Sequence, residues 1–341
     1  MDWPAVLSKL TAGEDLDASV AADALQTILR GEATDAQIAA FLIGLRAKGE
    51  SVSEVTAMVD VMLANATPIV LPPGDDAIDI VGTGGAPSRR KHALNVSTMA
   101  CFVAAGAGAR VLKHGNRKAS STSGSFDLLE ALGVNVELDA QGVARCISET
   151  NIGFAFARSF HPAMRFAGPV RSELGVPTVF NFLGPLSNPA GIRRQVIGVS
   201  DVSIAPIVVG TLAERGAPRA FVVCADDGTD EISLSGATTI TELRDGSIST
   251  YRFEPQQVGL KVVEAEVLAG GDAARNAEIA HSVFAGESSR VSDMVCLNAA
   301  AGLIAAGKAD DWQSGFEMAR NSVVNGLAAE KLQQLIAISN N

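Results

Sequence analysis

Basic and hydroxyl side chains gather in one short stretch of the sequence, residues 113–125, which is KHGNRKASSTSGS. Ammonium, guanidinium and hydroxyl groups are the donors that bind phosphate oxygens. A solvated basic loop is the alternative interpretation. The stretch, however, follows an apolar segment directly and leads into a helical one. We therefore predict a polyphosphate or phosphosugar site here.

Two further stretches offer backbone donors for an anion. Residues 82–85, GTGG, allow amides to approach an anion closely, although the GxGxxG spacing and the Walker Lys-Ser/Thr pair are both missing. Residues 95–98, NVST, open a predicted helix, where free N–H groups and the helix dipole favour phosphate. An ordinary helix N-cap would explain the second stretch equally well.

Carboxylates cluster in residues 225–233, ADDGTDEIS, after another apolar segment. An acidic surface turn is the usual explanation for such a run. Next to a phosphate site, however, Asp230 and Glu231 would supply the adjacent hard oxygen ligands that Mg²⁺ needs, since this ion also bridges to substrate phosphates. The residues together indicate a Mg²⁺-dependent enzyme acting on a phosphorylated substrate, and they do not separate a kinase from a glycosyl transfer.

The elements that must position these stretches alternate between short apolar segments and helical ones. Such alternation predicts an α/β fold with a parallel sheet and helices on both faces. Ligands of open parallel sheets bind outside the carboxyl ends of the strands, so the four polar stretches should converge there. The expected strands cover residues 77–85, 109–115, 152–157, 195–200 and 219–226, and the expected helices 95–108, 125–133, 141–150 and 206–216.

Residues 1–66 have helical apolar spacing throughout, which predicts a small all-helical N-terminal domain. The Pro- and Gly-rich residues 68–76 break this pattern and are expected to form a linker. Helix starts are marked by capping residues: Asp17, Thr34 with Gln37, and Ser51 with Glu54.

Two features interrupt the alternation in the second half of the chain. Residues 161–175 predict a helix interrupted at Pro169, and this region, with the Pro- and Gly-rich segment after it, is expected to rejoin the N-terminal helices. Asp245 and Gly246 lie between two strand-like segments and predict a β-hairpin. The tail from Asn276 onward is again helical.

The composition limits the class of protein. The chain has 341 residues, a formal net charge of −11 and 47% hydrophobic residues. Its acidity argues against general binding to nucleic acid or anionic membranes, and the apolar runs are too short to span a bilayer. No signal peptide is evident in the first residues, and the cysteines are widely separated within apolar runs. We expect a soluble, cytoplasmic protein with buried free thiols.

Six motifs, in this order and spacing, resemble the anthranilate phosphoribosyltransferase family over about residues 5 to 335. The motifs are DIVGTGG, NVST, KHGNRKASSTSGS, HPAM, FNFLGPLSNP and DGTDEIS. The resemblance implies a glycosyltransferase of tryptophan biosynthesis: the amine of anthranilate attacks C1′ of 5-phosphoribosyl 1-pyrophosphate and releases pyrophosphate. Pyrimidine nucleoside phosphorylases share the fold and are one alternative, and a non-catalytic binding protein of this fold is another.

The resemblance also implies which residues bind each ligand. Anthranilate would lie against Asn116, Arg171, His114, His161 and Gly82, with Arg171 suited to the carboxylate. No residue would act as a nucleophile or as an essential base. Mg²⁺ would be organised by Ser97, Asp230 and Glu231. Phosphoribosyl pyrophosphate would be held by Gly82, Gly85, Asn95, Ser97, Thr98, Lys113, Ser121 and Ser125.

The family likewise implies a helical domain, 1–70 plus about 161–190, and an α/β domain, 74–160 plus 191–341, whose central sheet is mostly parallel and flanked by helices. It implies a homodimer formed through the helical domain. One departure from the family pattern is residues 86–94, APSRRKHAL, which are longer by about three residues and have alanine where an Asp and a Thr are usual. The extra basic side chains there could contact phosphate or lie in solvent.

Overall fold

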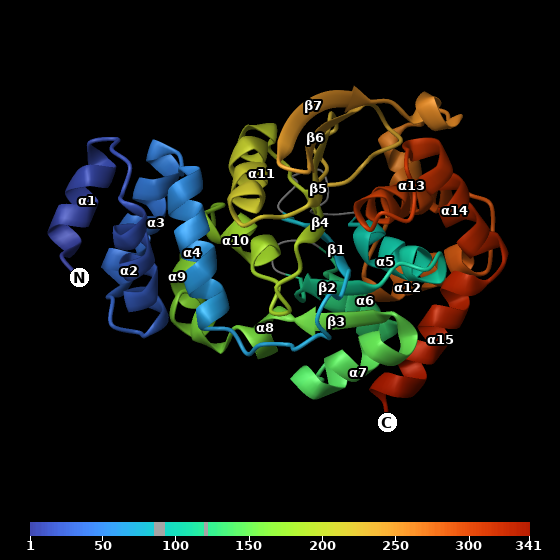
Figure 1. Cartoon of the computed structure of the whole chain (residues 1–341), viewed down its shortest axis with the longest axis horizontal. Coiled ribbons are helices and arrows are strands. Elements are labelled where there is room, and N and C mark those ends of the chain that lie inside the picture. The colour runs from blue at the N-terminus through green and yellow to red at the C-terminus, as the bar shows by residue number, and fades with distance from the viewer. Residues whose placement is uncertain (85–92, 119–121) are drawn as a thin grey trace.

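A computed structural model describes residues 1–84, 93–118 and 122–341. Within these ranges a seven-stranded sheet forms the centre of the larger part of the molecule, in the order β3-β2-β1-β4-β5-β6-β7 (Figure 1). The first five strands of this order are parallel, and β6 and β7 are antiparallel. The mostly parallel sheet predicted from the alternation is confirmed. The strands are β1 (Ile78–Gly82), β2 (Val111–Gly115), β3 (Ile152–Phe156), β4 (Arg194–Gly198), β5 (Arg219–Ala225), β6 (Thr238–Arg244) and β7 (Ser247–Phe253).

The central strands are buried on both faces because their side chains are apolar at successive positions. In β5, Phe221 and Val223 belong to one hydrophobic core, whereas Ala220 and Val222 belong to another. This follows from the alternation of side chains along a strand. A near-continuous apolar run is what a parallel strand covered on both faces requires.

One face of the sheet is covered by the larger core, which lies on the right of Figure 1. α5 and α13 pack against each other and against β1, with α14 and α15 outside them. α5 is almost wholly apolar and small, which lets it pack closely in this core. The helices of this side are α5 (Val96–Gly106), α6 (Ser125–Ala131), α12 (Ala273–Phe284), α13 (Arg290–Ala305), α14 (Trp312–Val324) and α15 (Leu327–Ser339), and the single turns η4 (Pro255–Val258) and η5 (Ala265–Leu268) lie between β7 and α12. On the opposite face of β2 and β3, α7 (Ala140–Thr150) packs in a small third cluster with Leu112 and Ala155.

The N-terminal helices form a bundle at the left of Figure 1, and its hydrophobic core continues onto the second face of the sheet. Both predicted capping boxes are present, Thr34 with Gln37 and Ser51 with Glu54. Asp17 precedes a helix as predicted, but its side chain does not cap that helix; its carboxylate accepts a hydrogen bond from the Lys9 ammonium at 3.3 Å instead. The helices are α1 (Trp3–Thr11), α2 (Ala18–Leu29), α3 (Asp35–Lys48) and α4 (Val52–Ala64).

The segment 161–190 packs against this bundle, with α9 on α3, η2 on α2 and α10 on α4. The prediction of a helix interrupted at Pro169 is wrong. A 3-10 turn ends at Phe166, and Pro169 lies in the first turn of the next helix, where its missing N–H costs nothing. The elements of this segment are η2 (Pro162–Phe166), α9 (Gly168–Leu174) and α10 (Phe180–Leu186), and the short helix α8 (Ala157–Phe160) connects β3 to it.

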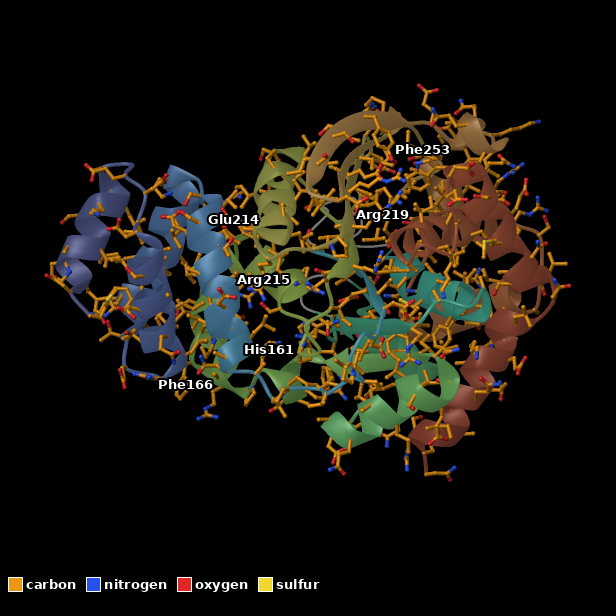
Figure 2. All side chains as sticks on the ribbon, viewed as in Figure 1. His161, Phe166, Glu214, Arg215, Arg219 and Phe253 are labelled. Carbon is orange, nitrogen blue, oxygen red and sulfur yellow. The ribbon has the colours of Figure 1, made fainter. Side chains whose placement is uncertain are left out.

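A further helix, α11 (Ala205–Glu214), follows the short turn η3 (Val202–Ile204) and joins the bundle to the sheet. Figure 2 shows Glu214 and Arg215 between α11 and α4. The Thr56 hydroxyl donates to Glu214 Oε2 at 2.7 Å, and Arg215 forms an ion pair with Asp60. These contacts hold α4 against α11, which itself packs on β5 and β6.

The parallel register brings the carboxyl ends of the strands together. Gly82 pairs with Gly198, and Gly115 pairs with Phe156. The four polar stretches therefore begin at one edge of the sheet, as predicted. At the antiparallel edge, Asp245 with φ +48° and Gly246 with φ +81° form the expected hairpin turn.

Two broader expectations can be compared with the described ranges. The four cysteines are buried and free, as expected. None of the helices in the described part of the chain is both long and apolar enough to cross a membrane.

Candidate active site

A cavity of about 830 Å³ lies at the carboxyl edge of the sheet, between the sheet and the segment 161–185. His161 is at this junction of the bundle and the sheet (Figure 2). Gly85 and Ser121 lie outside the described residues. The other predicted site residues all border this one cavity: Gly82, Asn95, Ser97, Thr98, Lys113, His114, Asn116, Ser125, His161, Arg171, Asp230 and Glu231.

The glycine-rich turn after β1 is closed onto the carboxylate pair. The Gly84 amide donates to Asp230 Oδ2 at 2.7 Å. A side chain at Gly82 would displace this carboxylate, because a Cβ there would lie 2.2 Å from the same oxygen. Glu231 is held in the same way, since its Oε1 accepts from the backbone N–H of Ser97 at the start of α5, at 3.3 Å. Both carboxylates are buried, with 6% exposure for Asp230 and 4% for Glu231.

Lys113 lies on β2 with its ammonium at the floor of the cavity, 2% exposed. Its Nζ donates to the Ile80 carbonyl and, at 3.3 Å, to the Ser97 hydroxyl. Asp79 lies on the neighbouring strand, and burial raises the pKa of its carboxyl to about 6 despite the nearby Lys113 charge. A buried ammonium beside the N-terminus of α5 forms a strong anion-binding arrangement.

Asn95 and Thr98 differ in how directly they face a ligand. The Asn95 amide oxygen accepts from the Ser123 hydroxyl at 2.9 Å and from Asn276 Nδ2 at 2.8 Å. Asn95 therefore joins the loop before α6 and the start of α12 to α5. The Thr98 hydroxyl is buried at the cavity wall and has no hydrogen-bond partner among the described residues.

His114 and His161 lie next to each other with ring centroids 5.0 Å apart. His114 Nδ1 lies 3.0 Å from the Gly184 carbonyl, and His161 Nε2 lies 3.0 Å from the Ser187 carbonyl. A carbonyl only accepts, so each of these ring nitrogens carries a hydrogen. Burial lowers the pKa of His114 to about 3 and also lowers that of His161. Both rings are therefore neutral at physiological pH.

The wall contributed by α9 and α10 combines a cation with an aromatic ring. The Arg171 guanidinium lies over the Phe180 ring, 5.0 Å from its centroid, and burial lowers its pKa. In the described ranges, no carboxylate lies within ion-pair distance of it. Its planar fork is thus available for a ligand carboxylate.

The basic stretch divides into parts with different contacts. The Asn116 carbonyl accepts from the Ser125 hydroxyl at 3.1 Å, which closes the loop at the cavity. Arg117 is committed elsewhere, because its guanidinium pairs with Glu130 at 2.6 Å and with Glu137 at 3.3 Å. Charge alone therefore does not identify the residues that face a ligand.

Several residues of the cavity wall were not among the predicted site residues. The sequence did mark the stretches in which they lie, because all of them are in or beside the motifs HPAM, FNFLGPLSNP and KHGNRKASSTSGS. The sequence did not indicate which side chains of these motifs face the cavity. They are Met164, Arg165, Phe180, Asn181, Gly184, Pro185, Ser123 and Gly124.

The fold and the site define a class of protein. The protein-family model described as "Glycosyl transferase family, a/b domain" matches residues 74–329 of the sequence. The model described as "Glycosyl transferase family, helical bundle domain" matches residues 4–66. These matches place the chain among glycosyltransferases that combine a helical bundle with an α/β domain.

Relatives and solved structures narrow the class. The chain is 48% identical to the anthranilate phosphoribosyltransferase of Nocardioides sp. (98% of each chain) and 44% identical to that of Arthrobacter sp. (99% of this chain, 96% of the relative). It matches the crystal structure of the Thermus thermophilus enzyme with 40% identity and a TM-score of 0.92 (98% of this chain, 99% of that one). It also matches the Saccharomyces cerevisiae enzyme in complex with PRPP and Mg, with 27% identity and a TM-score of 0.89 (99% and 98%). The chain belongs to the anthranilate phosphoribosyltransferase family, which confirms the resemblance seen in the motifs.

Proposed function

We propose that this chain transfers the phosphoribosyl group of 5-phosphoribosyl 1-pyrophosphate to the amine of anthranilate, giving N-(5-phosphoribosyl)anthranilate and pyrophosphate in tryptophan biosynthesis. The observation that carries this proposal is that one cavity is lined by two sets of residues from different elements, which we call its two ends. Lys113, Ser97 and the buried pair Asp230 and Glu231 form one set, in which Ser97 contacts both Lys113 and Glu231. Arg171 on α9 belongs to the other set, and it has no carboxylate partner among the described residues.

The phosphorylated substrate belongs at the end formed by β1, β2 and α5. The Lys113 ammonium and the N-terminus of α5 favour negative charge there. Donors placed where charge develops on the departing pyrophosphate stabilise the transition state more than the ground state. We assign to this end Gly82, Gly85, Asn95, Ser97, Thr98, Lys113, Ser121 and Ser125, of which Gly85 and Ser121 lie outside the described residues.

The donor set here fits Mg²⁺. Asp230 and Glu231 are adjacent and buried, and backbone N–H groups of Gly84 and Ser97 hold one oxygen of each in place. Mg²⁺ prefers one or two carboxylates, with substrate phosphates and water completing the shell. We propose that these two residues and the Ser97 hydroxyl hold the ion. When bound, it would neutralise charge on the pyrophosphate leaving group.

Anthranilate belongs at the end formed by β2, α9 and α10. The Arg171 guanidinium suits the carboxylate of anthranilate, because a planar fork forms two parallel hydrogen bonds. We also assign Asn116, His114, His161 and Gly82 to anthranilate; Gly82, which lies next to Asp230, would contact both substrates. The neutral histidine rings add no charge that would repel or trap the amine.

The chemistry does not need a protein nucleophile or a strong base. An aromatic amine is unprotonated at neutral pH, and its lone pair forms the N–C1′ bond while the C1′–O bond to pyrophosphate breaks, inverting that carbon. The anilinium-like product nitrogen is acidic and loses its proton readily. The residues therefore act by positioning the two substrates and by stabilising charge.

Further features are proposed on the family resemblance. The helical domain would comprise 1–70 and about 161–190, and the α/β domain 74–160 and 191–341. The chain would be a cytoplasmic homodimer joined through its helical domain; the 39% exposed Ile43 on α3 is compatible with this. Light scattering of the purified protein would test the dimer, with a mass of one chain contradicting it.

A fluorescence assay of anthranilate consumption tests the proposed function. Consumption should require both 5-phosphoribosyl 1-pyrophosphate and Mg²⁺. No consumption, together with phosphorolysis of a pyrimidine nucleoside, would instead assign the chain to the related phosphorylases. Binding of both substrates without turnover would indicate a binding protein.

A further inference from the structure

Asp227 is at the centre of the loop that carries Asp230 and Glu231, yet it does not border the cavity. Its Oδ1 accepts from the backbone N–H of Thr229 at 2.9 Å and from the Thr229 hydroxyl at 2.7 Å. Its Oδ2 accepts from the Ser233 hydroxyl at 2.7 Å and from the Ser235 hydroxyl. One carboxylate thus collects donors from both sides of the Asp230 and Glu231 pair.

These hydrogen bonds close the loop around one side chain. Burial alone would raise the pKa of Asp227, but the four hydrogen bonds together outweigh burial and lower it, so the group is ionised at neutral pH.

The far side of the loop is fixed separately, because the Asn298 amide bonds both the N–H and the carbonyl of Ile232, at 3.0 and 2.9 Å. The loop between β5 and β6 is therefore held from within and from α13.

The neighbouring acid makes a useful contrast. The Asp226 side chain is 52% exposed and forms an ion pair with Arg252 on β7. It carries the same charge one residue from Asp227, yet it bonds no donor of the loop segment 229–235 in the described structure. The two residues thus separate the effect of charge from the effect of loop geometry.

We propose that Asp227 is a positioning residue for the metal end of the site, fixing the backbone between Thr229 and Ser235 so that Asp230 and Glu231 point together at the cavity. This inference rests on the proposed metal-binding role of that pair. Partners in the outer shell of a metal site orient the ligands, and removing one weakens metal affinity by about 10- to 100-fold.

The test compares Asp227→Asn with Asp226→Asn. Isothermal titration of Mg²⁺ into protein with pyrophosphate should show affinity at least about 10-fold weaker for Asp227→Asn and within about twofold of wild type for Asp226→Asn. The KM for anthranilate should stay unchanged in both, because Arg171 and its neighbours are not touched. Asp227→Ala removes every acceptor and should weaken Mg²⁺ at least as much. If that variant does not fold, the asparagine variant decides.

The opposite results are equally clear. Unchanged Mg²⁺ affinity in Asp227→Asn, even with a lower Tm, would overturn the inference and leave a purely structural role. An equal loss in Asp226→Asn would overturn it as well, since charge alone would then explain the effect. If the wild-type protein binds no Mg²⁺ in the presence of pyrophosphate, both the proposed metal site and the inference are overturned. If wild-type turnover depends on Mg²⁺ but the Mg²⁺ affinity of Asp227→Asn is unchanged, only the inference is overturned.

Discussion

The tightest approach at the site is between β4 and the loop that carries the carboxylate pair, and it makes Gly198→Ala an informative variant. A Cβ on Gly198 would lie 1.7 Å from the Asp230 carbonyl oxygen and 2.5 Å from its carbonyl carbon. Carbon and oxygen atoms in contact are ordinarily about 3.3 Å apart or more, so one backbone would have to retreat by roughly 1.5 Å. Neither atom belongs to a side chain that could rotate away.

The displacement should affect metal binding and catalysis more than folding. Overpacking of this kind costs about 1–3 kcal/mol of stability, which a chain of this size should tolerate. Moving Asp230 by more than about 1 Å would break its 2.7 Å hydrogen bond with the Gly84 amide. A misplacement of about 1 Å can cost roughly 100-fold in rate, so kcat/KM should fall by about that factor, with a higher Mg²⁺ half-saturation.

The assay is steady-state anthranilate consumption as a function of Mg²⁺, with thermal unfolding measured alongside. Gly236→Ala is the matched control. Gly236 lies in the loop between β5 and β6, and a Cβ there would lie 3.8 Å from the nearest atom, which is an ordinary contact. The control should behave like wild type. A Gly198→Ala protein with wild-type Mg²⁺ half-saturation and kcat/KM would show that the position of Asp230 is not what the site depends on.

Three further variants follow from contacts in the structure. Arg117→Ala should leave both substrate KM values within about twofold, because its partly exposed guanidinium pairs with Glu130 and such pairs contribute at most about 1 kcal/mol. Asn276→Ala should lower the Tm, since it leaves the Asn95 oxygen and two backbone groups short of a buried partner, which costs about 1–3 kcal/mol per group. His114 is neutral in the fold but protonated in the unfolded chain between its lowered pKa of about 3 and 6.5. The contribution of His114 to stability should therefore fall as the pH drops through this window, by up to about 1.4 kcal/mol per unit, whereas Asp79, with its raised pKa of about 6, contributes in the opposite direction. His114→Gln removes only the first contribution, so the difference in stability between wild type and this variant should change with pH; equal slopes in denaturant titrations would contradict this.

Much of the fold was predictable because local chemistry and burial agree. The capping boxes at Thr34 and Ser51 fix helix starts whatever packs against them. The apolar run of β5 fits a strand covered on both faces. Asp17 and Pro169 show where local patterns fail to predict structure. The Asp17 side chain bonds Lys9 and does not cap the helix, and Pro169 lies at the start of a helix, where the pattern had predicted a break.

The site was predictable as a set of stretches but not as a set of contacts. Parallel strands end at one edge, so the polar residues that follow them had to meet. Which side chains face the ligand depends on partners far away in the sequence. Asn95 is occupied by Asn276, and Arg117 by Glu130. Such pairings arise from tertiary packing and leave no local pattern.

The central claim is that one cavity holds two substrates at two ends, and paired steady-state kinetics of Lys113→Met and Arg171→Ala test it most directly. Losing a hydrogen bond to a charged group costs about 1.5–3 kcal/mol, or roughly 10- to 150-fold. Lys113→Met should raise the KM for 5-phosphoribosyl 1-pyrophosphate by such a factor and leave that for anthranilate nearly unchanged, and Arg171→Ala should do the reverse. Equal effects of both variants on both KM values, or the opposite pattern, would contradict the two-ended site.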